Sequence, residues 1–277
     1  MARVWWNGEI VDEADARTSA LDRGLTWGWG LFETLRCYGG RPWALGEHME
    51  RLRAGAVVLD LPVPTDEEVA RAFEGVMGAN GLSDCGVRIT VTAGSGPPDP
   101  HEDPAGPPNV LVTAWPLRDY SDLYARGARL VTLVGQGRAM AGIKSTSYGL
   151  SVAGRIAARR GGADDALFVE QDGRVLETTG ANLFAIRGSE IVTAPTGDVL
   201  PGVTRGTVLQ VARELGLRTV ESDMLLDDLF ASDEVVLTSS LREVYGVSEV
   251  DGRPVRTGPL AAELRAAYRA RVLEILG

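Results

Sequence analysis

Tight turns between runs of strand-forming residues are the feature of this sequence that most limits its possible folds. The stretch RVWWNGEIV places Asn7-Gly8 between two such runs, and GLFETLRCYGGRPWAL places Gly39-Gly40 in the same way. The segment DALFVEQDGRVLE shows the same pattern around Gly173. Turns of this kind join neighbouring antiparallel strands. The sequence therefore predicts sheets that contain antiparallel hairpins.

Helical patterns alternate with these strand-like segments. We expect helices at 46–61, at 66–80 after the N-cap Thr65, at 151–160, at 204–216 and at 260–276. The segment SGPPDPHEDPAGPPN at 95–109 is too rich in Pro and Gly for regular structure, so we expect a loop there. Together, these helices and strands predict an α+β protein. We expect a small α+β domain at 1–118, a linker at 119–127 and a larger mixed α/β domain at 128–277.

Composition narrows the class of protein. The chain has 277 residues, of which 44% are hydrophobic, and its formal charge of −10 is spread along the sequence, which disfavours nucleic acid as a partner. It lacks a secretory apolar segment near its start and any run of 18 apolar residues, so no membrane partner is expected. Two cysteines and two histidines are too few for a disulfide framework or a zinc site. We expect a cytoplasmic protein with no metal and a small-molecule ligand.

The single lysine of the chain, Lys144, lies in AGIKSTSYG, whereas every other strong cation is an arginine. A guanidinium stays protonated, but a desolvated lysine amine can lose its proton and condense with a carbonyl. Lys144 is therefore either a surface residue kept by chance or an amine needed for chemistry. Composition alone favours neither.

Two further segments could serve pyridoxal phosphate bound to such a lysine. The phosphate of this cofactor suits a helix N-terminus, and its ring nitrogen suits a carboxylate. In LPGVTRG, a helix predicted to begin near Val203 and Thr204 would offer N–H groups and a hydroxyl, and Glu177 would offer the carboxylate. Each also has an ordinary explanation, a capped helix start for the first and a solvated acid for the second.

The combination of several segments is a more specific signal than any one of them. ETTGANLF at 177–184, IVT at 191–193 and LPGVTR at 200–205 resemble the signature of the class IV pyridoxal-phosphate enzymes of fold type IV. That family includes branched-chain and D-amino-acid aminotransferases, R-selective amine transaminases and aminodeoxychorismate lyase. LDRGLTWGWGLFETLRCY resembles its first active-site strand, EHMERL its conserved helix and IKSTSY its lysine segment. The resemblance covers nearly the whole chain and implies the two-domain architecture of fold type IV.

The resemblance also implies roles for individual residues. Lys144 would form the Schiff base and move the substrate proton, Glu177 would pair with the ring nitrogen, and Arg51 would bind the phosphate bidentately. The other cofactor contacts would come from Tyr148, Leu200, Val203, Thr204 and Ser240. Substrate contacts would come from Trp27, Phe32, Arg88, Ser240 and Leu241. His48, in the same helix as Arg51, is expected to be structural.

The residues around this site give mixed indications of the reaction. D-amino-acid aminotransferases typically follow the strand with Thr-Arg-Gly, but this chain has Ala93 in place of the arginine. Arg88 aligns with an arginine of branched-chain enzymes and would meet a substrate carboxylate, or form an ordinary ion pair. FET at 32–34 and TSSLREVYGV at 238–247 lean towards the lyases. An aromatic wall of Trp27, Trp29 and Phe32 would suit apolar side chains or amines.

From these indications we expect an aminotransferase that moves an amino group from an amino acid, of D or branched-chain type, or from a primary amine to a 2-oxo acid. The alternative is 4-amino-4-deoxychorismate lyase, which releases pyruvate and 4-aminobenzoate. A third hypothesis is a ligand-binding or scaffold protein without a cofactor, which the set Lys144, Glu177, Arg51 and Thr204 disfavours. The resemblance implies a homodimer.

Overall fold

The computed structural model describes residues 2–99, 101–135 and 140–277, and the chain divides into two compact units. The first unit comprises Met1–Arg118 and Ile143–Tyr148, and the second comprises Asp119–Gly142 and Gly149–Gly277. Residues 143–148, which we expected in the larger domain, therefore lie with the first unit. Residues 119–127, which we expected to be a linker, begin the second unit and contain the helix α4 (Ser121–Arg126).

The lysine segment belongs to the first unit because it hydrogen-bonds to the strand β3 (Gly30–Tyr38). The N–H of Phe32 donates to the carbonyl oxygen of Lys144 at 3.0 Å, and the N–H of Thr146 donates to that of Gly30 at 2.9 Å. Leu31 and Ser145 form an isolated antiparallel bridge. These contacts extend the sheet of the first unit by one short segment from far along the chain.

The remaining elements of the first unit follow the predicted order closely. They are β1 (Arg3–Trp6), β2 (Glu9–Asp12), the short 3₁₀ helix η1 (Glu13–Asp15), α1 (Arg23–Trp27), β4 (Arg41–Pro42), α2 (Leu45–Leu59), α3 (Asp66–Asn80), β5 (Cys85–Thr92) and β6 (Asn109–Pro116). The hairpin turns at Asn7-Gly8 and Gly39-Gly40 are confirmed, and all four residues have positive φ. The predicted N-cap Thr65 is confirmed at the start of α3, where it forms a capping box with Glu68.

One helix of the first unit was not predicted. The strand predicted from Gly30 onwards is confirmed as β3, but α1 (Arg23–Trp27) precedes it. The Asp22 side chain accepts a hydrogen bond from the N–H of Leu25 at 3.1 Å, which caps this helix. Gly28, in the left-handed conformation with φ of 66°, ends it. A capped turn at one end and a glycine at the other explain why a short helix forms before the strand.

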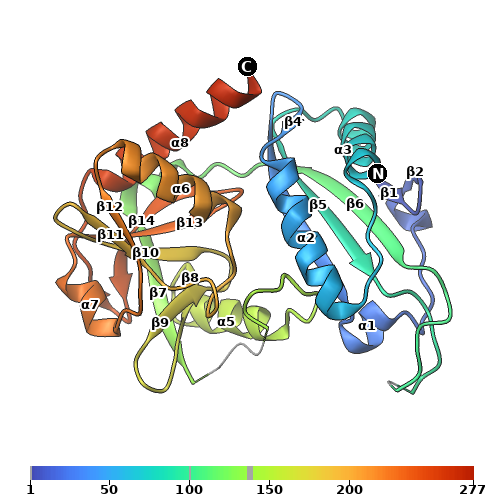
Figure 1. The fold of residues 1–277 in the computed structure, drawn as a ribbon, viewed down its shortest axis with the longest axis horizontal. Coiled ribbons are helices and arrows are strands. Elements are labelled where there is room, and N and C mark those ends of the chain that lie inside the picture. Colours follow the sequence, from blue (N-terminus) through green and yellow to red (C-terminus); the bar gives the residue numbers. More distant parts are fainter. Residues whose placement is uncertain (1, 100, 136–139) are drawn as a thin grey trace. The chain divides into compact units, whose positions relative to one another are not determined.

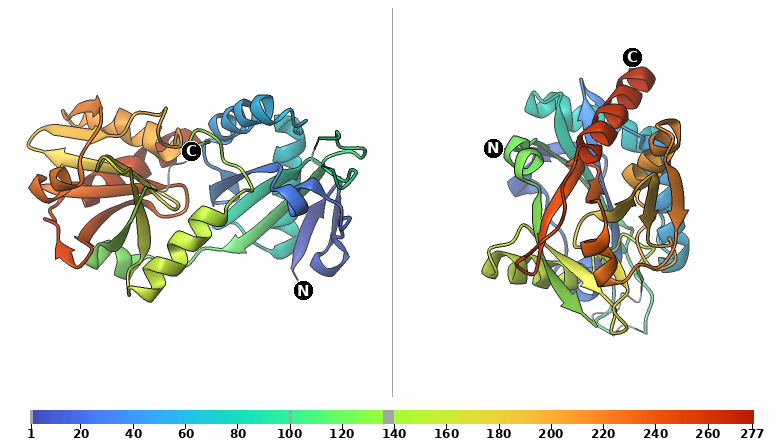
Figure 2. Two further views of the ribbon diagram at one scale, coloured as in Figure 1. Left: turned by 90° about the horizontal axis from the view of Figure 1, so that it is seen from below. Right: turned by 90° about the vertical axis from the view of Figure 1, so that its left-hand side faces the viewer.

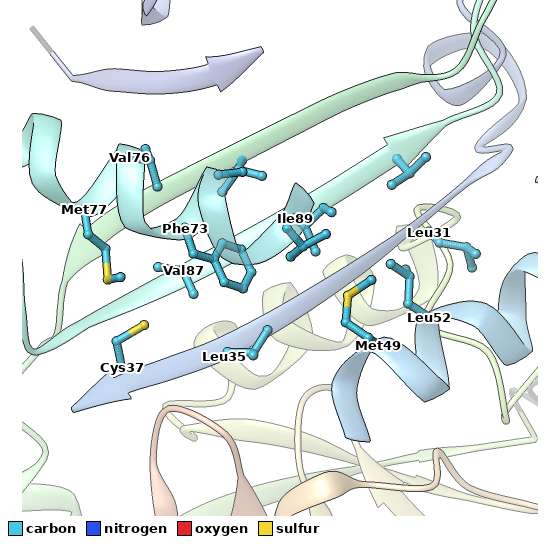
Figure 3. Packing of buried hydrophobic residues seen from close by; sticks show 14 of the residues in the cluster. Leu31, Leu35, Cys37, Met49, Leu52, Phe73, Val76, Met77, Val87 and Ile89 are labelled. Atoms are coloured by element: carbon cyan, nitrogen blue, oxygen red, sulfur yellow. The ribbon is translucent and has the colours of Figure 1, made fainter. Parts of the chain in front are cut away.

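The strands of the first unit form an antiparallel sheet in the order β2-β1-β6-β5-β3-β4 (Figure 1). Helices α2 and α3 cover one face of it, where their side chains meet those of β3 and β5 (Figure 3). Because side chains alternate along a strand, Leu31, Glu33 and Leu35 face these helices. Phe32 and Thr34 lie on the opposite face. This alternation separates the two groups of candidate site residues that β3 carries.

Both cysteines belong to this unit. Cys37 on β3 lies directly opposite Cys85 on β5, and both side chains are fully buried and free. They are distant in sequence but neighbours in the sheet, and they contribute to its apolar core as small hydrophobic residues.

The second unit is a mixed α/β structure, as predicted. Its other elements are β7 (Ala128–Val134), α5 (Gly149–Arg160), β8 (Asp165–Val169), β9 (Val175–Thr178), β10 (Asn182–Arg187), β11 (Glu190–Thr193), α6 (Val203–Glu214), β12 (Arg218–Glu221), α7 (Leu226–Ala231), β13 (Glu234–Ser239), β14 (Glu243–Val250), β15 (Arg253–Pro254) and α8 (Leu260–Leu276).

The sheet of this unit runs β12-β11-β10-β13-β14-β7-β8-β9, with β15 paired to β14. The pairs β11/β12, β7/β14 and β7/β8 are parallel and the others are antiparallel. Helix α5 packs on β8, α6 on β13 and α8 on β14 (Figure 2). The described helices include none that is long and apolar enough to cross a membrane.

Candidate active site

Lys144 is held in place through the backbone of its own segment. Besides the bonds to β3, the hydroxyl of Thr146 donates to the carbonyl oxygen of Gly28 at 2.9 Å. A Cβ atom at Gly30 would lie only 2.8 Å from Thr146 Oγ1, so glycine permits this close approach. The Nζ atom of Lys144 lies 4.7 Å from the ring centre of Phe32. The amine therefore projects from a fixed backbone towards an aromatic face.

Phe32 brings three other predicted site residues together around its ring. The guanidinium carbon of Arg88 lies 4.2 Å from the ring centre of Phe32, and the ring of Tyr148 meets it edge to face with centres 5.4 Å apart. With Lys144, these residues form a cluster of two cations and two aromatic rings. Attraction between a cation and the face of an aromatic ring favours both positions. We call Phe32, Arg88, Lys144 and Tyr148 the lysine cluster.

Arg51 takes part in a second cluster, on the helix-covered face of β3. Its Nε and Nη2 atoms donate to the two carboxylate oxygens of Glu33, each at 2.7 Å. His48 Nδ1 lies 2.7 Å from Glu33 Oε2 and acts as the donor, because an ionised carboxylate can only accept. Glu33 therefore occupies the Nε–Nη2 edge of Arg51. The bidentate phosphate contact expected from the sequence could not use that edge.

The charges of this second cluster are strongly coupled. Burial of Glu33 opposes its ionisation, but the positive charge of Arg51 and hydrogen bonds from His48 and Arg51 hold the pKa of Glu33 well below its usual range. Burial lowers the pKa of His48, and the charges of Arg51 and Lys144 lower it further, against the opposing effect of Glu33. The carboxylate is therefore ionised and the imidazole neutral near pH 7.

The two tryptophans of the predicted aromatic wall lie in different surroundings within the first unit. Trp27 is the last residue of α1 and is 49% exposed. Trp29 instead packs against the core of the unit, and its Nε1 donates to the carbonyl oxygen of Leu59 at 2.8 Å. The expected wall of three aromatic residues is thus not a continuous surface, and Phe32 is its member beside the lysine.

In the second unit, Glu177 is the penultimate residue of β9, and its side chain is buried at 3% exposure. Asn182 Nδ2 donates to Glu177 Oε2 at 3.0 Å and to the carbonyl oxygen of Leu200 at 2.9 Å, while the N–H of Leu200 donates to Glu177 Oε1 at 3.2 Å. Both carboxylate oxygens of Glu177 therefore accept hydrogen bonds within the second unit. The interpretation of Glu177 as a solvated acid at a strand end is therefore wrong.

The start of α6 lies directly after this network. Gly202 is the N-cap and lacks a capping side chain among the described residues, and Val203 and the buried Thr204 form the first turn. A Cβ atom at Gly202 would lie 1.9 Å from Asn182 Oδ1, so the packing requires glycine. Arg205 Nη2 donates to the carbonyl oxygen of Ala194 at 2.9 Å, which ties the turn to the end of β11. Helix starts of this kind can bind anions.

Ser240 and Leu241 lie in the turn between β13 and β14, and both are partly buried. Thr238, two residues before Ser240, is opposite Asn182 in the register of β10 and β13. The second unit thus places the predicted residues on neighbouring elements, around β9, β10, β13 and the start of α6.

Sequence reasoning assigned no role to Glu33 or Asn182. Asn182 belongs to the quoted ETTGANLF stretch, and its spacing of five residues from Glu177 across a short turn was an available signal. Glu33 was visible only as an acid within a strand of apolar residues. A charge at a core-facing position is the signal that predicts a buried ion pair.

Comparison with known proteins identifies the family of this chain. The family model described as amino-transferase class IV matches residues 30–250. The chain belongs to this family.

Relatives with assigned names are similar over almost their full lengths. The branched-chain-amino-acid aminotransferase of Salmonella typhimurium is 28% identical over 281 residues, covering 96% of this chain and 91% of the relative. The D-alanine aminotransferase of Bacillus licheniformis is 29% identical over 277 residues, covering 98% and 97%. These proteins are aminotransferases, so the comparison favours that activity over the lyase alternative.

A solved structure is also similar. The branched-chain amino acid aminotransferase of T.th. complexed with N-(5'-phosphopyridoxyl)-L-glutamate aligns with a TM-score of 0.90 and 32% identity, covering 98% of this chain and 94% of that one. The same enzyme was also solved with 4-methylvaleric acid. The fold type IV architecture expected from the sequence is confirmed.

We predict that Glu33→Gln destabilises the first unit by about 3–5 kcal/mol, because it removes the carboxylate that neutralises buried Arg51. The measurement is the free energy of unfolding in urea. The matched control is Asp66→Asn, which breaks a half-exposed ion pair with Arg53 and should cost less than about 1 kcal/mol. A similar small loss in both variants would contradict the role assigned to Glu33.

The lowered pKa of His48 predicts a pH dependence of stability. Below about pH 6.5 the unfolded chain takes up a proton at His48 that the folded chain does not, so stability falls as pH falls, by up to about 1.4 kcal/mol per pH unit. His48→Asn keeps a donor but cannot titrate, and should show a shallower slope. Urea unfolding between about pH 5.5 and about pH 7.5 measures both slopes. Equal slopes would show that another group controls this range.

Proposed function

We propose that the chain is a pyridoxal-phosphate-dependent aminotransferase, which transfers an amino group from an amino acid or a primary amine to a 2-oxo acid. The observation that carries the proposal is the buried Glu177 carboxylate, held by Asn182 and the N–H of Leu200 in a class IV chain whose one lysine lies on Phe32. The aminotransferase names of its relatives also support it.

The polar groups of the candidate site suit pyridoxal phosphate. A buried carboxylate suits a protonated ring nitrogen, and a helix start without a capping side chain is suited to a phosphate. In the proposal, Glu177 holds the ring nitrogen, Tyr148 meets the ring hydroxyl and Leu200 packs on the ring. The phosphate is held by the remaining residues of the set, Arg51, Val203, Thr204 and Ser240. Glu33 occupies the Nε–Nη2 edge of Arg51, so the proposal does not place the phosphate on that edge.

Pyridoxal phosphate supplies a carbonyl that condenses with amines and a ring that withdraws electrons. The chain supplies the remaining functions. Lys144, as the neutral amine, removes a proton from the substrate α-carbon and returns one on the other half of the cycle. Arg88, with Ser240 and Leu241, binds the substrate carboxylate. Phe32 and Trp27 accept an apolar side chain, which suits branched-chain amino acids or D-amino acids with apolar side chains.

The first half of the reaction tests this proposal. After incubation with pyridoxal phosphate, borohydride reduction should attach the cofactor to Lys144, as mapped by mass spectrometry, and Lys144→Ala should lose both the attachment and roughly a thousandfold or more of activity. Paired L and D amino acids and an R amine should be screened for loss of the cofactor's visible band. If none reacts while aminodeoxychorismate yields pyruvate, the enzyme is the lyase.

We also propose that the chain forms a homodimer in the cytoplasm. Exposed apolar side chains of the first unit support a subunit interface, among them Leu25, Trp27, Val57 and Val58. The two free, buried cysteines suit a reducing compartment. Sedimentation velocity should give twice the chain mass, and Val57→Asp with Val58→Asp should shift it to the monomer. A monomeric wild type would contradict the assembly but not the reaction.

A further inference from the structure

Arg88 is held by two neighbours on β3, and one of them has no role in the function proposed so far. Thr34 lies directly opposite Arg88 in the register of β3 and β5, and Arg88 Nε donates to Thr34 Oγ1 at 3.0 Å. Phe32, two residues earlier on the same face, stacks with the guanidinium. The side chain of Arg88 is therefore fixed both along its stem and across its plane.

This mode of attachment selects which edge of the guanidinium is used. A hydrogen bond at Nε occupies the inner edge, while the terminal Nη1 and Nη2 atoms form the outer edge, which matches the two oxygens of a carboxylate. An unattached arginine would lose rotamer freedom on binding an anion, and a pre-oriented one loses less. The Thr34 hydroxyl thus prepares Arg88 for bidentate contact with a carboxylate.

Phe32 relates this arginine to the reacting amine. The same ring carries Arg88 at 4.2 Å and Lys144 Nζ at 4.7 Å from its centre. Both cations belong to the first unit, and both contact the ring of Phe32. In an amino acid the carboxylate is bonded directly to the α-carbon. A substrate whose α-carbon is near Lys144 therefore has its carboxylate near the same ring.

We propose that Thr34 is a positioning residue, which orients Arg88 to bind the α-carboxylate and thereby makes the enzyme select carboxylate-bearing substrates over simple amines. The inference rests on the proposed function and deepens it. Thr34 itself touches no substrate. It acts through one hydrogen bond, and its effect should therefore depend on the charge of the ligand.

The test uses 4-methylvaleric acid, a carboxylate that cannot react, and its neutral amide on the cofactor-loaded enzyme. Thr34→Val removes the hydroxyl at nearly constant shape, and should weaken binding of the acid about tenfold while leaving the amide unchanged. Thr34→Ser restores the hydroxyl and should bind the acid within about twofold of the wild type. Isothermal titration calorimetry gives the dissociation constants, and thermal unfolding verifies that both variants fold.

Steady-state kinetics supplies an independent readout. In Thr34→Val the KM for the 2-oxo acid should rise about tenfold with kcat changed by less than about twofold, because only binding is affected. Unchanged acid binding in Thr34→Val, an equal loss for acid and amide, or no acid binding in the wild type would each overturn the inference. The binding arm needs no turnover, so acid binding without transamination would count against the proposed function alone.

Discussion

The buried carboxylate of Glu33 is the constraint on which the first unit depends. A charge with no exposure in an apolar interior is tolerated only with close partners, and Arg51 and His48 supply them from α2. The strand and the helix are consequently fixed to each other at one point. Because β3 turns Phe32 and Thr34 to its other face, the same strand that anchors Arg51 also sets the position of the lysine cluster.

The second unit also contains a buried carboxylate, that of Glu177. Glu177 is buried, and its oxygens receive hydrogen bonds from the Asn182 amide and the backbone of Leu200. Asn182 also binds the carbonyl oxygen of Leu200, so the strand β10 and the segment before α6 are joined through one side chain. Polar groups held in this way need little rearrangement when a ligand binds, which is the property that catalytic sites require.

Local signals in the sequence were sufficient for the hairpins and for the capped helix α3, and they singled out Lys144 and Glu177 as candidates for chemistry. They were insufficient where partners come from distant parts of the chain. The bridge between Leu31 and Ser145 places the lysine segment in the first unit, and no local pattern indicates it. The same holds for Glu33, whose pairing with Arg51 changes the edge that this arginine can offer to a phosphate. Trp29 looked like a site residue in sequence because aromatic residues suit cores and pockets equally.

The membership of residues 143–148 in the first unit means that this unit is built from two separate stretches of the gene. A piece ending at Arg118 would contain the sheet with helices α1, α2 and α3 but not Lys144, and its strand β3 would lose the hydrogen bonds to the lysine segment. Exchange of segments between related genes at that point would therefore pair a lysine from one parent with an aromatic face from the other. Chimeras that keep residues 30–32 and 143–148 from the same parent avoid this mismatch.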